Sequence, residues 1–205
     1  MADTLPEEIT RWRREQRAAL LAQRMAVPAD QRRQWGRAIT KLLLGRFPVL
    51  KQSVVGFYWP FKGEFDPRFA IHELRTAGAR VALPVVLQKN APLEFRAWWP
   101  GVATSKGVFD LPVPDGTDVL RPTALLIPPV GFDALGYRLG YGGGYFDRTL
   151  AVMQPAPLKI AVGFELSRIA TIRPQPHDIA MDFVVTEAGV YRATADGLVL
   201  TTGAT

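Results

Sequence analysis

The sequence predicts a single-domain α/β protein with a mostly parallel sheet flanked by helices, and three observations support this. Residues 53–59, 66–77 and 80–86 have the patterns of a strand, a helix and a strand, a unit that places its two strands side by side in parallel. Further short apolar runs flank another helical segment later in the chain. The 205 residues are 48% hydrophobic, which fits one domain with a sizeable core.

Two helices are expected before the first strand. The first spans residues 6–25, because Pro6 suits the start of a helix and two glutamates follow it in the first turn. The second runs over 28–44, because Pro28 again suits the first turn and Gly45 ends the helix. The sequence therefore predicts an N-terminal helical pair ahead of the α/β core.

The strand–helix–strand unit follows from its residue types. Residues 53–59 read SVVGFYW, and valines and aromatic residues favour strands. Asp66 and Pro67 provide an N-cap and a first-turn proline for a helix that Gly78 ends. Residues 80–86 read RVALPVV, the pattern of a buried strand.

The rest of the chain completes the domain with short elements. We expect strands over 93–98, 124–128, 158–164, 183–186 and 190–193, and a helix over 145–153. Residues 100–122 are rich in Gly, Pro and Asp and are expected to cover the sheet edge as a loop. Residues 194–205 are expected to be a loose tail, so that the single domain 1–205 has its folded core over about 10–193.

Composition excludes several kinds of chemistry. There is no cysteine, which rules out disulfides, thiolate nucleophiles and cysteine-based zinc sites. His72 and His177 are the only histidines, which rules out a multi-histidine metal site. No run of about 18 apolar residues suggests a membrane span, and residues 1–10 lack the apolar centre of an export signal. We therefore expect a cytoplasmic protein that does not bind membranes.

The positive charge lies near the N-terminus. The net charge is +6, and residues 1–51 hold 11 Lys and Arg against 5 Asp and Glu, whereas the remainder is balanced. Such a block indicates an anionic partner, which could be a nucleotide, another polyanionic small molecule or a nucleic acid. A solvated helix face is the alternative interpretation.

Residues 128–147, PPVGFDALGYRLGYGGGYFD, form the most informative segment. Gly142, Gly143 and Gly144 let backbone N–H groups approach an anion without obstruction by side chains. The helix that follows adds positive potential at its N-terminus, and Arg138 adds a fixed charge suited to phosphate oxygens. The segment therefore predicts a phosphate-binding loop, although its spacing is not that of a P-loop. A tight turn without a ligand is the alternative.

This segment resembles the signature of the 5-formyltetrahydrofolate cyclo-ligase family. The matching positions are Phe132, Asp133, Gly136, Arg138, Leu139, Gly140, Gly142, Gly144, Tyr145 and Asp147, with further family-like positions at Gly63-Glu64, Leu83-Pro84, Pro176-His177-Asp178 and Thr186-Glu187. The resemblance covers about residues 10–190 and implies a Rossmann-like fold. It also implies an enzyme that uses ATP and Mg²⁺ to convert 5-formyltetrahydrofolate to 5,10-methenyltetrahydrofolate with release of ADP and phosphate. We further expect a monomer whose partner is this small-molecule substrate and not a nucleic acid.

The resemblance also implies roles for particular residues. The ATP phosphates would lie on Arg13, Arg17, Arg138, Gly140, Tyr141, Gly142, Gly143, Gly144 and Tyr145, and Arg138 and Tyr145 would be catalytic. Asp147 and Asp178 would hold Mg²⁺. Glu64 would bind the pterin N–H groups, and Tyr145 would contact the folate. Phe57, Trp59 and Phe109 are further candidates for the apolar wall around the folate, and core packing is the favoured alternative for these three.

Three positions depart from the family pattern. Arg13 stands where the family usually has lysine, and Phe146 stands where it usually has tyrosine. Residues 110–114 lack the Glu-Pro pair of many bacterial members, so folate contacts there can differ.

Two other functions are compatible with parts of the sequence. A nucleotide- or folate-binding regulatory module without turnover would keep the glycine-rich loop and lack the chemistry. RNA binding would use the basic N-terminal segment, but aromatic residues are interleaved there only at Trp12 and Trp35, and no RNA-binding signature is present.

Overall fold

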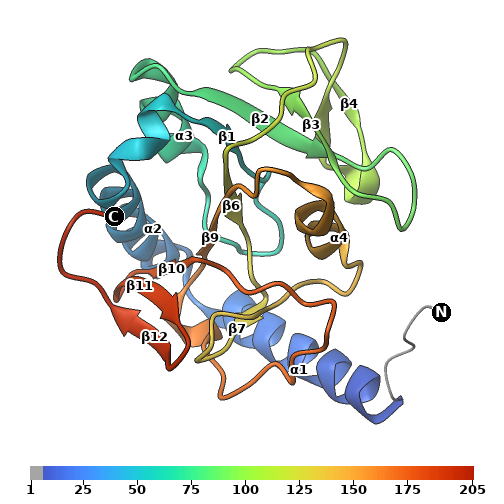
Figure 1. The fold of residues 1–205 in the computed structure, drawn as a ribbon, viewed down its shortest axis with the longest axis vertical. Coiled ribbons are helices and arrows are strands. Elements are labelled where there is room, and N and C mark those ends of the chain that lie inside the picture. Colours follow the sequence, from blue (N-terminus) through green and yellow to red (C-terminus); the bar gives the residue numbers. More distant parts are fainter. Residues whose placement is uncertain (1–6) are drawn as a thin grey trace.

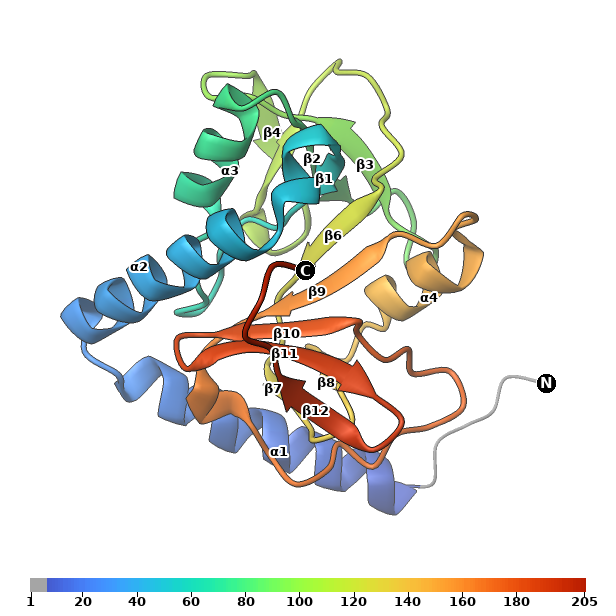
Figure 2. The same ribbon diagram turned by 60° about the vertical axis from the view of Figure 1, so that its left-hand side comes forward.

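The structure is a computed structural model that describes residues 7–205, apart from the side chain of Phe109. Its centre is an eight-stranded sheet in the order β12-β11-β10-β9-β6-β1-β2-β3 (Figures 1 and 2). The strands of this sheet are β1 (Val54–Gly56), β2 (Arg80–Val85), β3 (Glu94–Ala97), β6 (Ala124–Ile127), β9 (Leu158–Val162), β10 (Phe183–Thr186), β11 (Gly189–Thr194) and β12 (Gly197–Leu200).

The middle of the sheet is parallel and its edges are antiparallel. Strands β2, β1, β6, β9 and β10 pair in parallel, whereas β3, β11 and β12 pair antiparallel with their neighbours. The chain passes from β1 outward to β2 and then returns to place β6 on the other side of β1. This reversal of direction beside β1 creates a topological switch point, where open α/β sheets bind their ligands. The predicted α/β fold with a mostly parallel sheet is confirmed.

Helices cover both faces of the sheet. The helices are α1 (Glu7–Ala26), α2 (Ala29–Arg46), α3 (Arg68–Thr76) and α4 (Tyr145–Val152). Side chains of α2 and α3, such as Leu43 and Ile71, pack with Leu126 and Ile160 in one core cluster. Leu150 of α4 belongs to a second cluster with the alternate residues of the same strands. Because successive strand side chains point to opposite faces, these strands are buried on both sides.

Helix α1 lies beside a small hairpin and away from these two clusters (Figure 1). The hairpin consists of β7 (Gly131–Phe132) and β8 (Arg138–Leu139), inside the glycine-rich segment. Leu20 of α1 is buried against Val130, Leu139 and Ile172. This contact fixes α1 along the loop that follows β8.

Most predicted elements are present within a few residues, but two expectations are wrong. Residues 194–205 are not a loose tail, because β12 pairs with β11 through a two-residue turn at Ala195 and Asp196. Residues 100–122 are not only loop, because β4 (Thr104–Lys106) and β5 (Pro112–Pro114) form a separate hairpin. Both hairpins are short and are held by backbone pairing between neighbouring strands.

Candidate active site

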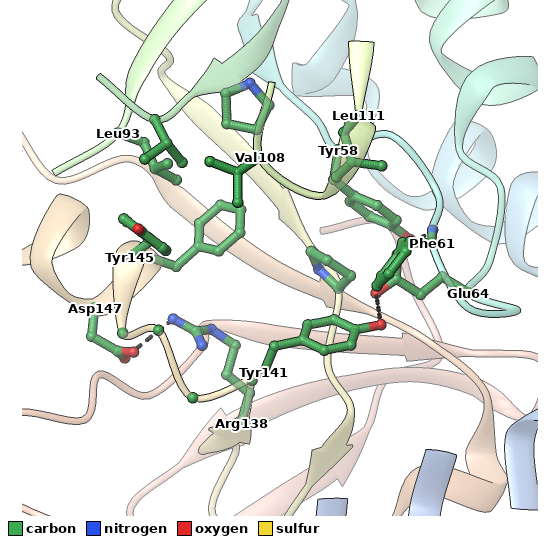
Figure 3. Close-up of a pocket in the computed structure, with 18 of the residues that line it drawn as sticks. Tyr58, Phe61, Glu64, Leu93, Val108, Leu111, Arg138, Tyr141, Tyr145 and Asp147 are labelled. Atoms are coloured by element: carbon green, nitrogen blue, oxygen red, sulfur yellow. Dashed lines mark hydrogen bonds and ion pairs between the residues drawn. The ribbon is translucent and has the colours of Figure 1, made fainter. Parts of the chain in front are cut away.

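A pocket lies at the carboxyl ends of the central parallel strands (Figure 3). Tyr58 and Trp59 follow β1, Pro84 lies near the end of β2, and Pro128 follows β6. Because β1 and β6 are the strands beside which the chain reverses direction, the pocket occupies the switch point of the sheet. The glycine-rich loop after β8 and one face of α1 complete its lining.

The glycine-rich loop presents free backbone N–H groups to this pocket. Gly142 and Gly144 have φ values of +98° and +61°, which side-chain-bearing residues rarely adopt. A Cβ on Gly143 would lie 2.9 Å from the ring of Tyr145. Within the described part of the chain, the N–H groups of residues 141–144 donate no hydrogen bond. A loop of this kind can surround an anion with backbone donors.

Two arginines hold the carbonyl groups of the same loop. The Nε atom of Arg17 donates to the carbonyl oxygen of Gly140 at 2.7 Å. The guanidinium of Arg148 donates to the carbonyl oxygen of Gly143. With these carbonyls bonded to cations, the loop is held in place while its N–H groups stay available.

Arg138 is buried next to this loop with unused donors. The residue is 6% exposed, and its Nε and NH2 atoms make no hydrogen bond. Its NH2 lies 3.1 Å from Oδ1 of Asp147, an ion pair without hydrogen-bond geometry, and its guanidinium lies over the ring of Phe146. Buried polar groups normally have hydrogen-bond partners, so these two nitrogens keep donor capacity that an anion could use.

Arg13 forms an ion pair with Asp178, which the sequence predicts as a ligand of Mg²⁺ together with Asp147. Its guanidinium bonds both oxygens of Asp178 and also donates to the carbonyl oxygens of Ile172 and Arg173. Asp178 additionally accepts the N–H of Gln175. Arg13 and Asp178 therefore line the pocket as a closed, buried ion pair.

The two predicted metal ligands differ in availability. In Asp147, Oδ1 accepts the N–H of Ile179 at 3.3 Å, and Oδ2 has no partner among the described residues. Both oxygens of Asp178 are already bonded. No group of three or more His, Asp or Glu side chains in residues 7–205 could hold a metal alone. Mg²⁺ needs only one or two carboxylates when phosphate oxygens and water complete its shell, so Asp147 fits this role better than Asp178.

Glu64 lies at the opposite end of the pocket from Arg138 (Figure 3). Its Oε2 accepts the N–H of Phe61 at 2.9 Å, and its Oε1 accepts the hydroxyl of Tyr141 at 2.8 Å. Burial raises the pKa of Glu64 to about 7, while Arg24, the Phe61 N–H and the Tyr141 hydroxyl oppose that rise. The pocket thus has a cationic end at the glycine-rich loop and a carboxyl group at the other end.

The wall between these ends is mostly apolar. Tyr145 lines it as expected. Phe57 does not, because it is fully buried in the core and packs edge-on against Trp98. The side chain of Phe109 lies outside the described part of the structure.

Sequence reasoning missed several lining residues. The wall is made by Leu93, Val108, Leu111, Pro112 and Val113. Leu93 opens a strand that the sequence predicts, and the other four fall in the segment expected to be a loop, where apolar residues gave no periodic signal. Arg24 was also missed, although it follows Arg13, Arg17 and Leu20 on the same face of α1 at helical spacing.

The fold and this pocket define a doubly wound α/β protein with a pocket at its switch point, where such folds bind ligands. The chain belongs to the 5-formyltetrahydrofolate cyclo-ligase family, whose model matches residues 9–187. A relative named 5-formyltetrahydrofolate cyclo-ligase from Escherichia coli K12 is 30% identical over 175 residues, which cover 82% of this chain and 96% of the relative. A relative of the same name from Mycolicibacterium smegmatis is 33% identical over 178 residues, which cover 83% and 91%.

A solved structure agrees with this assignment. The NMR structure of the Aquifex aeolicus 5,10-methenyltetrahydrofolate synthetase matches with a TM-score of 0.77 at 28% identity, over 93% of this chain and 96% of that one. The predicted family resemblance is confirmed, and with it the assignment of the chain to a family of enzymes. Separately, no helix within residues 7–205 is long and apolar enough to cross a membrane.

Proposed function

We propose that the protein converts 5-formyltetrahydrofolate to 5,10-methenyltetrahydrofolate with ATP and Mg²⁺, releasing ADP and phosphate. Family membership and the names of the relatives support the folate reaction. One observation carries the nucleotide part of the proposal: the buried guanidinium of Arg138 has an Nε without a hydrogen bond and an NH2 held only by its ion pair with Asp147, beside a loop with unused N–H groups. Phosphate oxygens would satisfy both sets of donors.

The proposed reaction begins with attack of the formyl oxygen on the γ-phosphorus of ATP, which breaks the bond from that phosphorus to ADP. N10 then attacks the formyl carbon and loses its proton, and phosphate leaves with the former formyl oxygen. Such a transfer asks the protein for positioning and charge stabilisation rather than for a nucleophile. The absence of cysteine from the sequence is compatible with this chemistry.

The two ends of the pocket would divide the substrates. The triphosphate would lie on Arg17, Arg138 and the backbone of residues 140–145, with Arg13 at the border of the same site, where Asp178 neutralises its charge. The pterin N–H groups would bond Glu64, and the apolar wall would enclose the rings between the two ends. Tyr145 lies along that wall at the start of α4, where it can contact both substrates.

Mg²⁺ would be held by Asp147 through its free Oδ2 atom, with phosphate oxygens and water as further ligands. The ion would supply charge neutralisation at the phosphate oxygens. Asp178 is a second candidate ligand for Mg²⁺. It would have to break its ion pair with Arg13, or contact the metal ion while it keeps that pair.

The position of the arginines also bears on the choice of partner. Arg13, Arg17 and Arg24 of the basic N-terminal segment line or border the pocket, which suits a small anionic ligand better than a nucleic acid. We also propose a monomeric, cytoplasmic enzyme, as the sequence predicts.

An activity assay tests the proposed function directly. Purified protein is mixed with 5-formyltetrahydrofolate, ATP and Mg²⁺, and the near-ultraviolet absorbance of the methenyl product is followed together with ADP release. We expect one ADP for each methenyl product, and no product when ATP is omitted. Measurable binding of both ligands without product would contradict the proposal and favour a regulatory binding module.

A further inference from the structure

A chain of hydrogen bonds links α1 to Glu64 through Tyr141 of the glycine-rich loop. The NH2 group of Arg24 donates to the hydroxyl oxygen of Tyr141 at 2.7 Å, and that hydroxyl donates to Oε1 of Glu64 at 2.8 Å. The side chains of Arg24 and Glu64 are only 3% and 4% exposed. Their nearest charged atoms are 4.0 Å apart, and the hydroxyl of Tyr141 is hydrogen-bonded to both side chains. Figure 3 shows the bond from Tyr141 to Glu64.

Arg24 is itself fixed by two backbone carbonyl groups. Its Nε donates to the carbonyl oxygen of Lys62 at 3.0 Å, and its NH1 donates to the carbonyl oxygen of Pro129 at 3.2 Å. Lys62 precedes Glu64 by two residues, and Pro129 follows the end of β6. A guanidinium bonded in three directions cannot turn without breaking buried hydrogen bonds, so it is a rigid support for Tyr141.

Glu64 is held at both of its oxygens. Oε1 takes the bond from Tyr141 and Oε2 takes the bond from the N–H of Phe61. A carboxylate oxygen has two acceptor sites, so each oxygen can still accept one further N–H group. A glutamate side chain has several rotatable bonds, and two fixed partners restrict the plane of its carboxylate before a ligand arrives.

We propose that Arg24 and Tyr141 are positioning residues that orient Glu64 to accept the paired N–H groups of an amino-pyrimidinone ring, the end group of a reduced folate. This inference rests on the proposed function and deepens it. It moves the side chain of Tyr141 from the predicted phosphate site to the folate end, although its backbone stays in the glycine-rich loop.

Helix α1 supplies an arginine to each end of the pocket. Arg17 holds the loop at the carbonyl of Gly140, and Arg24, two turns further along the same face, holds the next residue, Tyr141. The structure therefore assigns Arg17 to the phosphate end and Arg24 to the folate end. Substitutions at the two arginines should then affect different substrates.

Tyr141→Phe tests this assignment because it removes one hydroxyl and little volume. We expect the KM for 5-formyltetrahydrofolate to rise about tenfold, the equivalent of one hydrogen bond to a charged group, while kcat and the KM for ATP change much less. Tyr137→Phe is the matched control, since Tyr137 does not line the pocket. An unchanged folate KM in Tyr141→Phe, or an equal rise in Tyr137→Phe, would overturn the proposal.

A double-variant cycle separates positioning from direct contact. If Tyr141 acts through Glu64, Tyr141→Phe should weaken folate binding little further in a Glu64→Gln background. A full additional loss would mean that Tyr141 contacts the folate independently, which contradicts the positioning role. Arg24→Gln gives a second route, and the selective loss of folate affinity is again expected provided that its melting temperature and circular dichroism report a folded protein.

A failure of the positioning role can be distinguished from a failure of the proposed reaction. Calorimetric titration with 5-formyltetrahydrofolate in the absence of ATP compares wild type with Tyr141→Phe and needs no turnover. Weaker folate binding by the variant supports the positioning role even if wild type makes no product, which would contradict only the proposed reaction. Equal binding by both proteins refutes the positioning role even if wild type is fully active.

Discussion

Glu64 is buried, and burial disfavours the ionised form of its carboxyl group. Burial raises its pKa to about 7, against the opposing effects of Arg24 and Tyr141, while Tyr58 and Asp66 are further titratable groups nearby. Only the ionised form can accept two N–H groups from a folate. The residue is therefore a candidate for pH control of substrate binding close to neutrality.

We expect folate affinity to fall as the pH decreases through about 7. Above that pH Glu64 is ionised and accepts the pterin N–H groups, whereas below it the carboxyl gains a proton and one acceptor site becomes a donor. The measurement is the folate dissociation constant between pH 6 and pH 8.5. Glu64→Gln should bind weakly at every pH, and a pH dependence that survives in this variant would assign it to another group.

Arg17 allows a prediction at the phosphate end. Arg17→Ala removes the donor to the carbonyl of Gly140 and a positive charge beside the loop. We expect the KM for ATP to rise about tenfold or more and the KM for folate to change little, because charge-assisted contacts to phosphate contribute most there. Arg14→Ala, at an exposed position of the same helix, is the control. Equal KM values for ATP in the two variants would remove Arg17 from the site.

At the scale of elements, the predictable parts were those with strong local patterns. The strand of residues 183–186 was predicted with its exact bounds, because FVVT is a compact β-branched run. β12 was missed although Leu198, Val199 and Leu200 are an apolar run, because the run is short and its stability comes from pairing with β11. Phe57 and Tyr58 show the same limit, since neighbouring aromatic residues point to opposite faces and the pattern alone does not say which face meets the ligand.

The glycine-rich loop was predicted because its backbone conformation requires glycine, and glycines are visible in the sequence. Gly144 has a φ of +61°, and a Cβ there would lie 2.9 Å from NH1 of Arg148. Gly144→Ala should therefore cost about 1–2 kcal/mol of backbone strain and displace the arginine, so that kcat/KM for ATP falls. Gly45→Ala in α2 is the matched control, because nothing lies within 4 Å of its Cβ and alanine favours a helix. Stability curves and ATP kinetics for both variants check this, and normal ATP kinetics in Gly144→Ala would count against the loop as a phosphate site.

At the scale of the whole molecule, the pocket is assembled from distant parts of the chain. Arg13 in the first helix bonds Asp178, 165 residues later, and the carbonyls of Ile172 and Arg173 in the same late segment. The side chains of this ion pair are 6% and 9% exposed. The site and the fold therefore depend on the same long-range contact, which no local pattern in the sequence could specify.

This contact leads to a prediction about coupling. Arg13→Gln or Asp178→Asn alone should each destabilise the protein by about 3 kcal/mol, because each leaves a buried charge without its partner. The double variant should lose clearly less than the sum of the two, since neither charge then remains. Denaturant unfolding of the four proteins measures the coupling. Additive losses would mean that the ion pair contributes no net stability and that Arg13 stabilises the fold through the carbonyls of residues 172 and 173.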